Sequence, residues 1–294
     1  MRKFLFISAL IVFASCEKEI PLDVDEIAPR IVVNSIFSAG DTIWLQLSES
    51  RDVIYDGDLP NLTTAEAKLL DENQNVLGTF THQSEGSYYL ADVYPEVGSS
   101  YGLSVSNSGF ETVTATSKTP QIVEIISIDT VTKSNYLEMD ITFTDDGSQQ
   151  NYYSVTIINF EAYFDEFGEI VEYWEYPYIC TDEIIPVNGG ADWDGEKCAD
   201  EFYFTDETFN GTNYTFKAKT WKIASEEGEV AAGVMVIVRS LSEDYFKYKL
   251  TYSKYLETQG SPFAEPVQVY SNIENGFGIF GGYSSAVSDT LIVL

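Results

Sequence analysis

A short acidic segment offers oxygen ligands at a spacing that suits a hard cation. In "DWDGEKCADE", residues 192–201, the carboxylates of Asp192, Asp194 and Glu196 stand at alternate positions. Alternating carboxylates are typical of the first half of a calcium-binding loop, whose twelfth position needs a bidentate glutamate. Tyr203 stands at that position instead. The sequence therefore leaves two alternatives, a weak Ca²⁺ site or an acidic loop exposed to solvent.

The two cysteines of this region, Cys180 and Cys198, are candidates for a disulfide. Closing that loop would contribute about 3 kcal/mol in the chain-entropy description. A thiolate metal site is an alternative, but the one histidine of the chain, His82, is far away in the sequence. Two free thiols are the third alternative. We expect the disulfide because disulfides persist in the oxidising compartments that exported proteins enter.

Catalysis finds little support in the remaining residues. His82 lies in "THQSEG" beside an expected turn, and one histidine among many serines does not specify a Ser–His–Asp arrangement. Carboxylates are so abundant that no pair of them stands out as a glycosidase-like pair. Cysteines joined in a disulfide are not available as nucleophiles. We therefore expect no catalytic residues and no enzymatic activity.

The segment "GFGIFG", residues 276–281, matches the glycine spacing of a dinucleotide-binding loop. Such a loop follows a strand and opens a helix, because the helix N-terminus holds the pyrophosphate. The residues after Gly281 form one strand-like segment, "YSSAVSDTLIVL", and contain no room for that helix and a following strand. We expect these glycines to allow tight turns or a close approach of two backbones instead.

A third cysteine, Cys16, stands between an apolar run and a run of charges. Two basic residues precede the apolar run at 4–13, and two small residues follow it. This is the layout of a secretory signal peptide. The small pair before the cysteine predicts a lipoprotein signal peptide at 1–15 with Cys16 lipidated, and an ordinary signal peptide is the alternative. Buried acyl chains contribute about 0.8 kcal/mol per methylene, so two or more of them anchor a protein stably.

Residues 16–28 are expected to form a lipidated tether. The acidic residues just after Cys16 are similar to the surface-export signal of Bacteroidota lipoproteins, and a solvated linker is the alternative. No later segment reaches the roughly 20 apolar residues that span a bilayer. The most apolar one, 230–238, fits a buried strand. We expect a protein anchored to the outer membrane by its lipid, at the cell surface.

The composition excludes some partners. The 294 residues contain 47 acidic and 16 basic residues, which gives a formal net charge of −31. Nucleic acids and anionic membrane surfaces attract basic proteins, so we expect neither to bind this chain directly. Aromatic residues make up 14% of the sequence, which is far more than acidic disordered chains contain. The chain therefore has the material for a packed core.

Alternating apolar and polar segments predict a mainly β fold with two domains. "RIVVNSIFS" and "TIWLQLSES" flank the turn "AGD", which is a hairpin pattern, and turns recur every 8–12 residues or so. We expect an immunoglobulin-like or transthyretin-like β-sandwich at 29–120. A second, β-rich domain at 121–294 should include an acidic excursion at 161–207, with 15 acidic residues and one lysine.

Aromatic residues gather in this excursion and form the candidate ligand site. Side chains of tyrosine and tryptophan stack on sugars and pack against peptides, so either ligand is conceivable. Packing beneath a long loop is the alternative. The residues concerned are Tyr173, Trp174, Tyr176, Tyr178 and Trp193.

One helix is predicted at 242–259. Apolar and tyrosine residues recur there every three or four positions, from Leu241 to Leu256. Ser242 can cap the helix, acidic residues occupy its first turn, and glycine and proline follow its end. We expect the tyrosines to pack into the core rather than to form a ligand platform.

Several segments together resemble a known family. They are the lipobox with "CEKEIPLDV", "RIVVNSIFS", "YPEVGSSYGLSVSNSGFETVTATSKTP" and "VYSNIENGFGIFGGYSS". The chain resembles the Bacteroidota lipoprotein family of unknown function DUF4249 over nearly its whole mature length. The resemblance implies an outer-membrane lipoprotein beside a TonB-dependent receptor of the SusC-like kind, and it brings no catalytic or ligand-binding residues.

Three functions are compatible with these observations. The first is a non-enzymatic accessory protein that captures a glycan or peptide ligand for a TonB-dependent transporter. The second is a structural or adhesive surface protein without a small-molecule ligand. The third, a hydrolase, would have to rely on carboxylate chemistry or on His82.

Overall fold

The structure is a computed structural model that describes residues 28 to 292 with several gaps. The described ranges are 28–51, 59–164, 167, 169–183, 185–188, 190–191, 195–221, 229–259 and 265–292. The predicted signal peptide at 1–15, Cys16 and nearly all of the tether lie outside these ranges. So do three predicted site residues, Asp192, Trp193 and Asp194.

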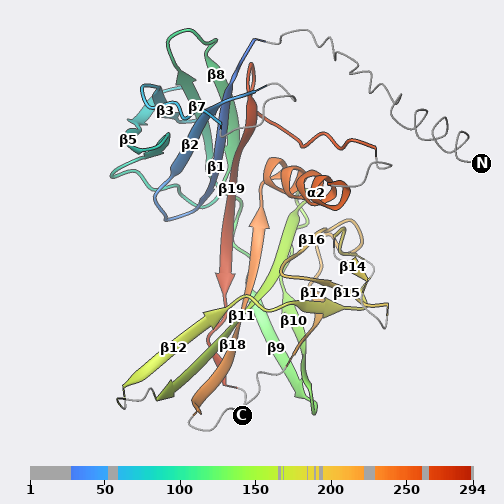
Figure 1. Cartoon of the computed structure of the whole chain (residues 1–294). Helices are drawn as coiled ribbons and strands as arrows, with labels where there is room; N and C mark the ends of the chain where they lie inside the picture. Colours follow the sequence, from blue (N-terminus) through green and yellow to red (C-terminus); the bar gives the residue numbers. More distant parts are fainter. Residues whose placement is uncertain are drawn as a thin grey trace, which may run out of the picture.

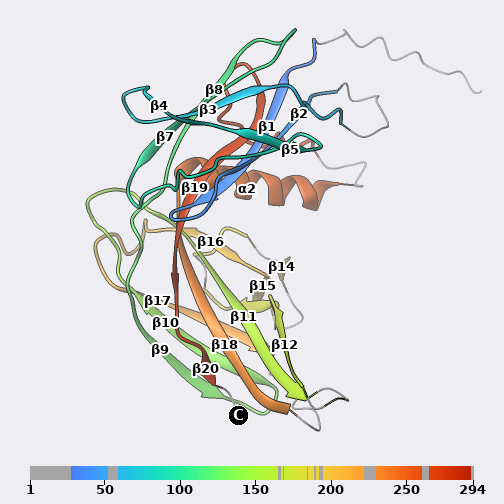
Figure 2. The same cartoon turned by 90° about the vertical axis from the view of Figure 1, so that its left-hand side faces the viewer.

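The described part of the chain is mainly β with one helix, which confirms the predicted fold class. Figures 1 and 2 show an upper and a lower group of strands, with the helix between them on one side. None of the described helical residues forms a segment of the length and apolar character needed to cross a membrane.

The upper sandwich is built from the first eight strands, which form two facing sheets. One sheet has the order β1-β2-β6-β5 and the other β4-β3-β7-β8. The strands are β1 (Ile31–Ser38), β2 (Trp44–Glu49), β3 (Glu66–Leu70), β4 (Val76–Thr79), β5 (Thr81–Ser84), β6 (Ser87–Tyr89), β7 (Ser100–Ser106) and β8 (Val113–Lys118). The predicted hairpin is present, since β1 and β2 pair in the antiparallel direction. Every second side chain of β1 is buried, as the alternation in the sequence predicts.

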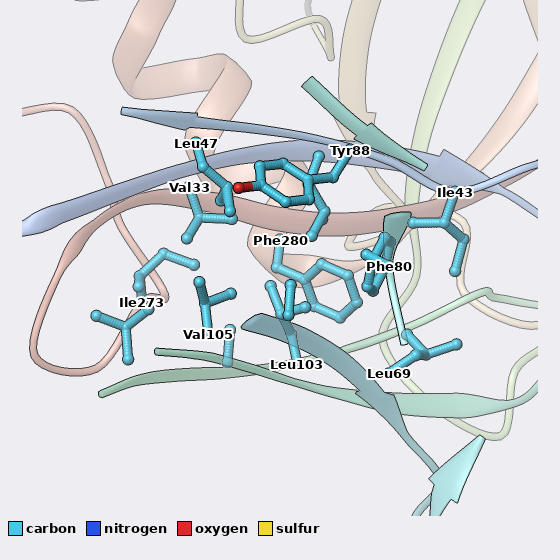
Figure 3. Close-up of a cluster of buried hydrophobic side chains, with 14 of the residues drawn as sticks. Val33, Ile43, Leu47, Leu69, Phe80, Tyr88, Leu103, Val105, Ile273 and Phe280 are labelled. Atoms are coloured by element: carbon cyan, nitrogen blue, oxygen red, sulfur yellow. The ribbon is translucent and has the colours of Figure 1, made fainter. Parts of the chain in front are cut away.

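Figure 3 shows the core between these two sheets. Val33 and Leu47 extend from one sheet towards Leu103 and Val105 of the other. Phe280, which is far away in the sequence, lies in the middle of the same core and is fully buried. The upper sandwich therefore depends on residues from the C-terminal end of the chain.

The lower sandwich contains the remaining strands. Its first sheet is built on β12-β11-β18, with β16 and β20 beside it, and its second has the order β14-β15-β13-β17-β10-β9. The strands are β9 (Ile125–Thr132), β10 (Tyr136–Phe143), β11 (Tyr152–Phe164), β12 (Ile170–Glu175), β13 (Ile179–Thr181), β14 (Gly190–Ala191), β15 (Lys197–Ala199), β16 (Phe202–Thr205), β17 (Tyr214–Trp221), β18 (Glu229–Leu241), β19 (Phe277–Val287) and β20 (Leu291–Ile292).

Strand β19 belongs to both sandwiches. It pairs in parallel with β1 from Phe277 to Tyr283, and antiparallel with β18 from Tyr283 to Val287. One sheet of ten strands therefore runs through the molecule, as the long descending strand in Figure 1 shows. The division at residue 120 stays a prediction, to which the structure adds that β19 completes the N-terminal half.

The glycines of "GFGIFG" and the glycine that follows allow β19 to approach its neighbours. Gly278 has φ +107°, and a Cβ on it would overlap the carbonyl oxygen of Val33. A Cβ on Gly282 would overlap the carbonyl oxygen of Lys118. The segment is a strand and not a phosphate-binding loop, in agreement with the interpretation from sequence.

The helix α2 (Glu243–Thr258) matches the predicted range to within one residue at each end. The Ser242 side chain accepts a hydrogen bond from the backbone N–H of Tyr245 at 3.2 Å, as expected of an N-cap. Tyr245 and Phe246 are buried, whereas Tyr252 and Tyr255 are 39% and 37% exposed. The expected core packing of the tyrosines therefore holds for the first half of the helix only.

The predicted acidic excursion at 161–207 is more ordered than its composition suggests. It contains the end of β11 and all of β12 to β16. Phe202 and Phe204 on β16 are fully buried in the lower core. The sequence pattern missed β16, because Phe202, Tyr203 and Phe204 are all buried and the strand therefore shows no alternation.

Candidate functional site

The predicted aromatic residues do not form one platform. Tyr173 and Trp174 are neighbours on β12, so their side chains lie on opposite faces of the sheet. Trp174 is opposite Phe160 on β11, and their ring centroids are 4.5 Å apart. Tyr176 and Tyr178 lie in the link between β12 and β13 and are 60% and 64% exposed. Trp193 is outside the described residues.

The predicted calcium ligands are only partly described. Glu196 forms an ion pair with Lys219, and this hydrogen-bonded contact raises the pKa of the lysine. Asp192 and Asp194 lie outside the described residues. Within the described ranges, no three His, Cys, Asp or Glu side chains are grouped so that they could hold a metal ion. Calcium binding at 192–196 stays a prediction.

The disulfide joins Cys180 and Cys198 with an S–S distance of 2.06 Å. The two residues face each other directly on the antiparallel strands β13 and β15. The bond therefore fastens β15 to β13, which in turn pairs with β17 of the second sheet.

His82 lies on β5 in the upper sandwich, where its ring packs against that of Tyr88 at 5.0 Å.

The side of β11, β18 and β12 that carries α2 is the best candidate for a binding surface, and we call it the outer face. Val155 and Val236 point into the lower core, so residues of the opposite parity lie on the outer face. Trp174 is 45% exposed there, and Val287 is 55% exposed. Its partly exposed apolar members are Ile158, Phe160, Trp174, Met235 and Val287, whereas Ile237 of the same parity is buried.

Figure 1 looks onto the outer face. The helix α2 covers its upper end, and no other described helix or strand lies in front of β11, β18 and β12 below it. The outer face therefore leaves several apolar side chains partly exposed. Sheets usually bury such a face against another element, so an open apolar face indicates a contact with another molecule.

A buried ion pair fixes the upper end of the outer face, beneath α2. Arg239 pairs through Nη1 with the Glu201 carboxylate, and their side chains are only 17% and 15% exposed. The carboxylate also accepts hydrogen bonds from Ser154 (2.6 Å) and from the hydroxyl of Tyr203 (2.5 Å). A buried charge pair is tolerated when hydrogen bonds satisfy it in this way.

Aromatic rings from three elements surround this pair. The guanidinium of Arg239 lies 5.7 Å from the ring centroid of Tyr283, and the Lys249 ammonium lies 5.4 Å from that of Tyr203. Burial works against the charge on Arg239, but Glu201 outweighs it and the pKa of Arg239 is raised. Burial and the Glu201 charge raise the pKa of the Tyr203 hydroxyl, which therefore stays protonated and donates its hydrogen bond.

The sequence interpretation did not single out Arg239 or Glu201. A usable pattern exists, because Arg239 is the one charged residue in the apolar run "GVMVIVRSL". A charge within a buried strand needs a partner, which predicts an acidic residue nearby in the fold. The cluster formed by Arg239, Glu201 and the tyrosines around them positions α2 on the sheet. This cluster contains no activated nucleophile. What the outer face can do chemically is bind, through apolar and aromatic contacts.

Comparison with known sequences places nearly all of the described fold, up to residue 289, in one family. The sequence model of the domain of unknown function DUF4249 matches residues 17–289. The chain belongs to the DUF4249 family. The match extends across both sandwiches and α2, so the outer face and the shared strand β19 both lie within this DUF4249 domain. No curated protein shows a significant match to it.

Three of the solved structures that match this DUF4249 protein show distant likenesses. A DUF3823 family protein from Bacteroides ovatus ATCC 8483 is 14% identical, with 70% of this chain and 91% of its own covered, at a TM-score of 0.20. A DUF3823 family protein from Parabacteroides merdae ATCC 43184 is 10% identical, with 74% and 92% covered, at 0.15.

A protein from Bacteroides uniformis ATCC 8492, provisionally assigned as carbohydrate-binding, is 9% identical to the DUF4249 chain. The alignment covers 83% of this chain and 96% of that protein, at a TM-score of 0.17. TM-scores of this size are too low to show a shared fold.

Proposed function

We propose that this protein is a non-enzymatic lipoprotein of the outer membrane that binds a TonB-dependent, SusC-like transporter as an accessory subunit in nutrient uptake. The observation that carries the proposal is the open outer face. An apolar sheet face bounded by a helix is typical of a surface that docks onto another protein.

The outer face has the composition of such a contact. The rings of Trp174 and Phe160 contact each other at a tilt of 44°, and aromatic residues carry much of the energy of protein interfaces. Tyr203, whose hydroxyl donates to Glu201, packs with Tyr245 and Phe246 of α2 at the upper end of this face. A partner that covers the outer face would bury these side chains without any rearrangement of the sheet, which lowers the entropic cost of binding.

Attachment to the membrane would come from lipid on Cys16. The formal net charge of −31 repels anionic surfaces, so the protein body has no electrostatic attraction to them. Two or three acyl chains would supply the missing affinity. The ligand that the pair of proteins takes up would be a glycan or a peptide, the two classes that exposed tyrosine and tryptophan side chains bind.

Co-purification from native outer membranes tests the proposal. The full-length protein should carry a β-barrel partner with it, and Trp174→Ala should reduce the amount of that partner at least tenfold. Trp44→Ala is the matched control, because Trp44 is 46% exposed on β2 and also packs against one aromatic ring, that of Tyr89. Recovery of the protein alone in every mild detergent would contradict the transporter role and leave the adhesive function.

The lipid anchor has its own test. Growth with a radiolabelled or alkyne-tagged fatty acid should label the wild-type protein and leave Cys16→Ala unlabelled and free of the membrane fraction. Protease treatment of intact cells should cleave the wild-type protein if it is at the cell surface. An unmodified thiol on Cys16 in the mature protein would overturn this part of the proposal.

A further inference from the structure

Strand β9 ends the second sheet of the lower sandwich with an uncovered edge. It is the last strand in the order β14-β15-β13-β17-β10-β9, and β10 is its one partner among the described strands. Figure 2 shows β9 at the side of the molecule opposite α2 and the outer face. Six of its eight residues are exposed, and Ile126 and Val131 are about half exposed, at 47% and 50%.

The hairpin between β9 and β10 determines which backbone groups face outwards. The N–H of Lys133 donates to the carbonyl of Tyr136 at 2.9 Å, so this pair is hydrogen-bonded. Bonded and non-bonded pairs alternate along antiparallel strands. Asp129 is therefore bonded to its partner Asp140, whereas Thr130 and Thr132 direct their N–H and C=O groups away from β10. Ile128 does the same.

The other sheet edges of the described fold are short, charged or covered. Strands β4, β5 and β14 have four, four and two residues. Strand β12 carries Glu172 and Glu175. The edge of β8 is covered by segment 272–275, which bonds to Thr112, Thr114 and Thr116.

The edge of β9 has little of the usual protection, since Asp129 is its one charged residue. Proteins normally shield a free edge with lysine, proline, a short length or a cover, because unpaired backbone groups attract other strands. The sequence "IISIDTVT" has eight residues, six of them β-branched, and its one charge is Asp129. A strand of this length and composition pairs readily with a further strand.

We propose that the free edge of β9 binds an extended segment of a partner protein by strand addition, and that this segment carries a lysine or arginine opposite Asp129. Such a segment would bond to the outward backbone groups of Ile128, Thr130 and Thr132. The proposal goes beyond the transporter contact, since β9 lies in the sheet that faces away from the outer face.

The charges on the sheet surface specify the basic residue. Asp129 lies directly opposite Asp140, and like charges in that position destabilise a strand pair. Lys217 lies opposite Asp140 on its other side, whereas the outer side of Asp129 has no strand in the described fold. A basic residue on an added strand would give Asp129 an opposite charge as its neighbour, as Lys217 does for Asp140. A second copy of this chain would instead bring another Asp129 and another net charge of −31.

A designed peptide tests the edge with the full-length protein in detergent. The probe has eight residues of alternating valine and threonine with a central lysine, and it is N-methylated at alternate positions so that only one of its edges can pair. NMR hydrogen exchange should show slower exchange at the amides of Ile128, Thr130 and Thr132. A peptide with glutamate in place of lysine should bind at least tenfold more weakly.

Proline variants supply matched controls. Thr130→Pro removes an N–H that points outwards, so it should leave the melting temperature nearly unchanged and weaken peptide binding at least tenfold. Asp129→Pro removes an N–H that is bonded to β10, so it should lower the melting temperature clearly. If Thr130→Pro does not fold, Thr132→Pro at the exposed end of β9 replaces it.

Three results would overturn the proposal. The first is unchanged exchange at the β9 amides up to the solubility limit of the peptide. The second is equal binding of the peptide by wild type and by folded Thr130→Pro or Thr132→Pro. The third is slower exchange at the same amides without peptide as the protein concentration rises, which would assign the edge to a second copy.

Discussion

The side chain of Asn272 takes the place of a neighbouring strand for the backbone of Phe280. Its Nδ2 lies 2.8 Å from the carbonyl oxygen of Phe280, and the N–H of Phe280 donates to its Oδ1 at 3.0 Å. The same Nδ2 also reaches the carbonyl oxygen of Thr116 on β8 at 3.1 Å. One amide thereby fixes the Phe280 ring in the upper core, where it lies 4.6 Å from that of Phe37.

Replacement of this amide should destabilise the upper sandwich. Asn272→Leu keeps a similar volume but leaves the backbone N–H and C=O of Phe280 without these partners. We expect a loss of about 1–3 kcal/mol in the free energy of unfolding, measured by urea denaturation. Asn73→Leu, on an exposed turn, is the control and should have little effect. Equal effects of the two substitutions would contradict the bridging role.

Two glycine substitutions should separate close approach from backbone strain. Gly282→Ala places a methyl group against the backbone of Lys118, so it should cost about 3 kcal/mol or more. Gly40→Ala meets no atom within 4 Å but has to adopt φ +84°, so it should cost about 1–2 kcal/mol. Calorimetry gives both values. A smaller cost for Gly282→Ala than for Gly40→Ala would contradict the packing of β19 on the upper sandwich.

The ion pair beneath α2 should be sensitive to the loss of one partner. Glu201→Ala leaves the charge of Arg239 buried and unpaired, which costs about 3–5 kcal/mol for buried pairs. The double substitution Glu201→Ala with Arg239→Met should cost less than the sum of the two single substitutions, because it removes both charges and leaves no buried charge unpaired. Chemical denaturation of the four proteins measures this coupling. Strict additivity would show that the pair does not act as a unit.

Three buried tyrosines should make the fold sensitive to alkaline pH. Burial is the largest cause that raises the pKa of Tyr153, Tyr203 and Tyr245 above the ordinary value of 10.0. The folded protein thus holds these phenol protons more tightly than the unfolded chain does. This contribution to stability is complete below about pH 10 and is lost as the pH rises above it.

Absorbance at 295 nm checks this prediction. The three tyrosines should ionise only as the protein unfolds, in one cooperative step above pH 10. Tyr203→Phe should make stability less dependent on pH in that range, whereas Tyr178→Phe, at a site 64% exposed, should not. Gradual ionisation of all tyrosines in a folded protein would contradict the burial of the three hydroxyls.

Local patterns in the sequence were sufficient for several elements. The tyrosine spacing and the Ser242 cap predict α2 nearly to the residue, because both signals act within one or two turns. The alternation in "RIVVNSIFS" and "TIWLQLSES" predicts β1 and β2 for the same reason. The disulfide of Cys180 with Cys198 was the expected one of three alternatives, because these two cysteines remain besides Cys16 and disulfides persist in exported proteins.

The remaining features depend on contacts that no local pattern encodes. The parallel pairing of β1 with β19 joins residues about 245 positions apart, such as Val32 and Phe277. Its register is set by the cores on both sides. The aromatic residues of β12 look like one cluster in the sequence, but strand alternation places Tyr173 and Trp174 on opposite faces. The pairing partner of Arg239 could not be predicted from the sequence around it, because Glu201 comes close to Arg239 only when the chain folds.

The parallel arrangement of β1 and β19 also determines how the protein would respond to mechanical force. The chain enters β1 at its upper end, directly after residue 30, whereas β19 leaves the pair at its lower end towards β18. A pull between the N-terminal segment and the lower sandwich would load all the hydrogen bonds of the pair at once, in shear, instead of opening them one after another. Seven residues of paired strand would therefore act as a clamp that resists sudden forces far better than its equilibrium stability suggests.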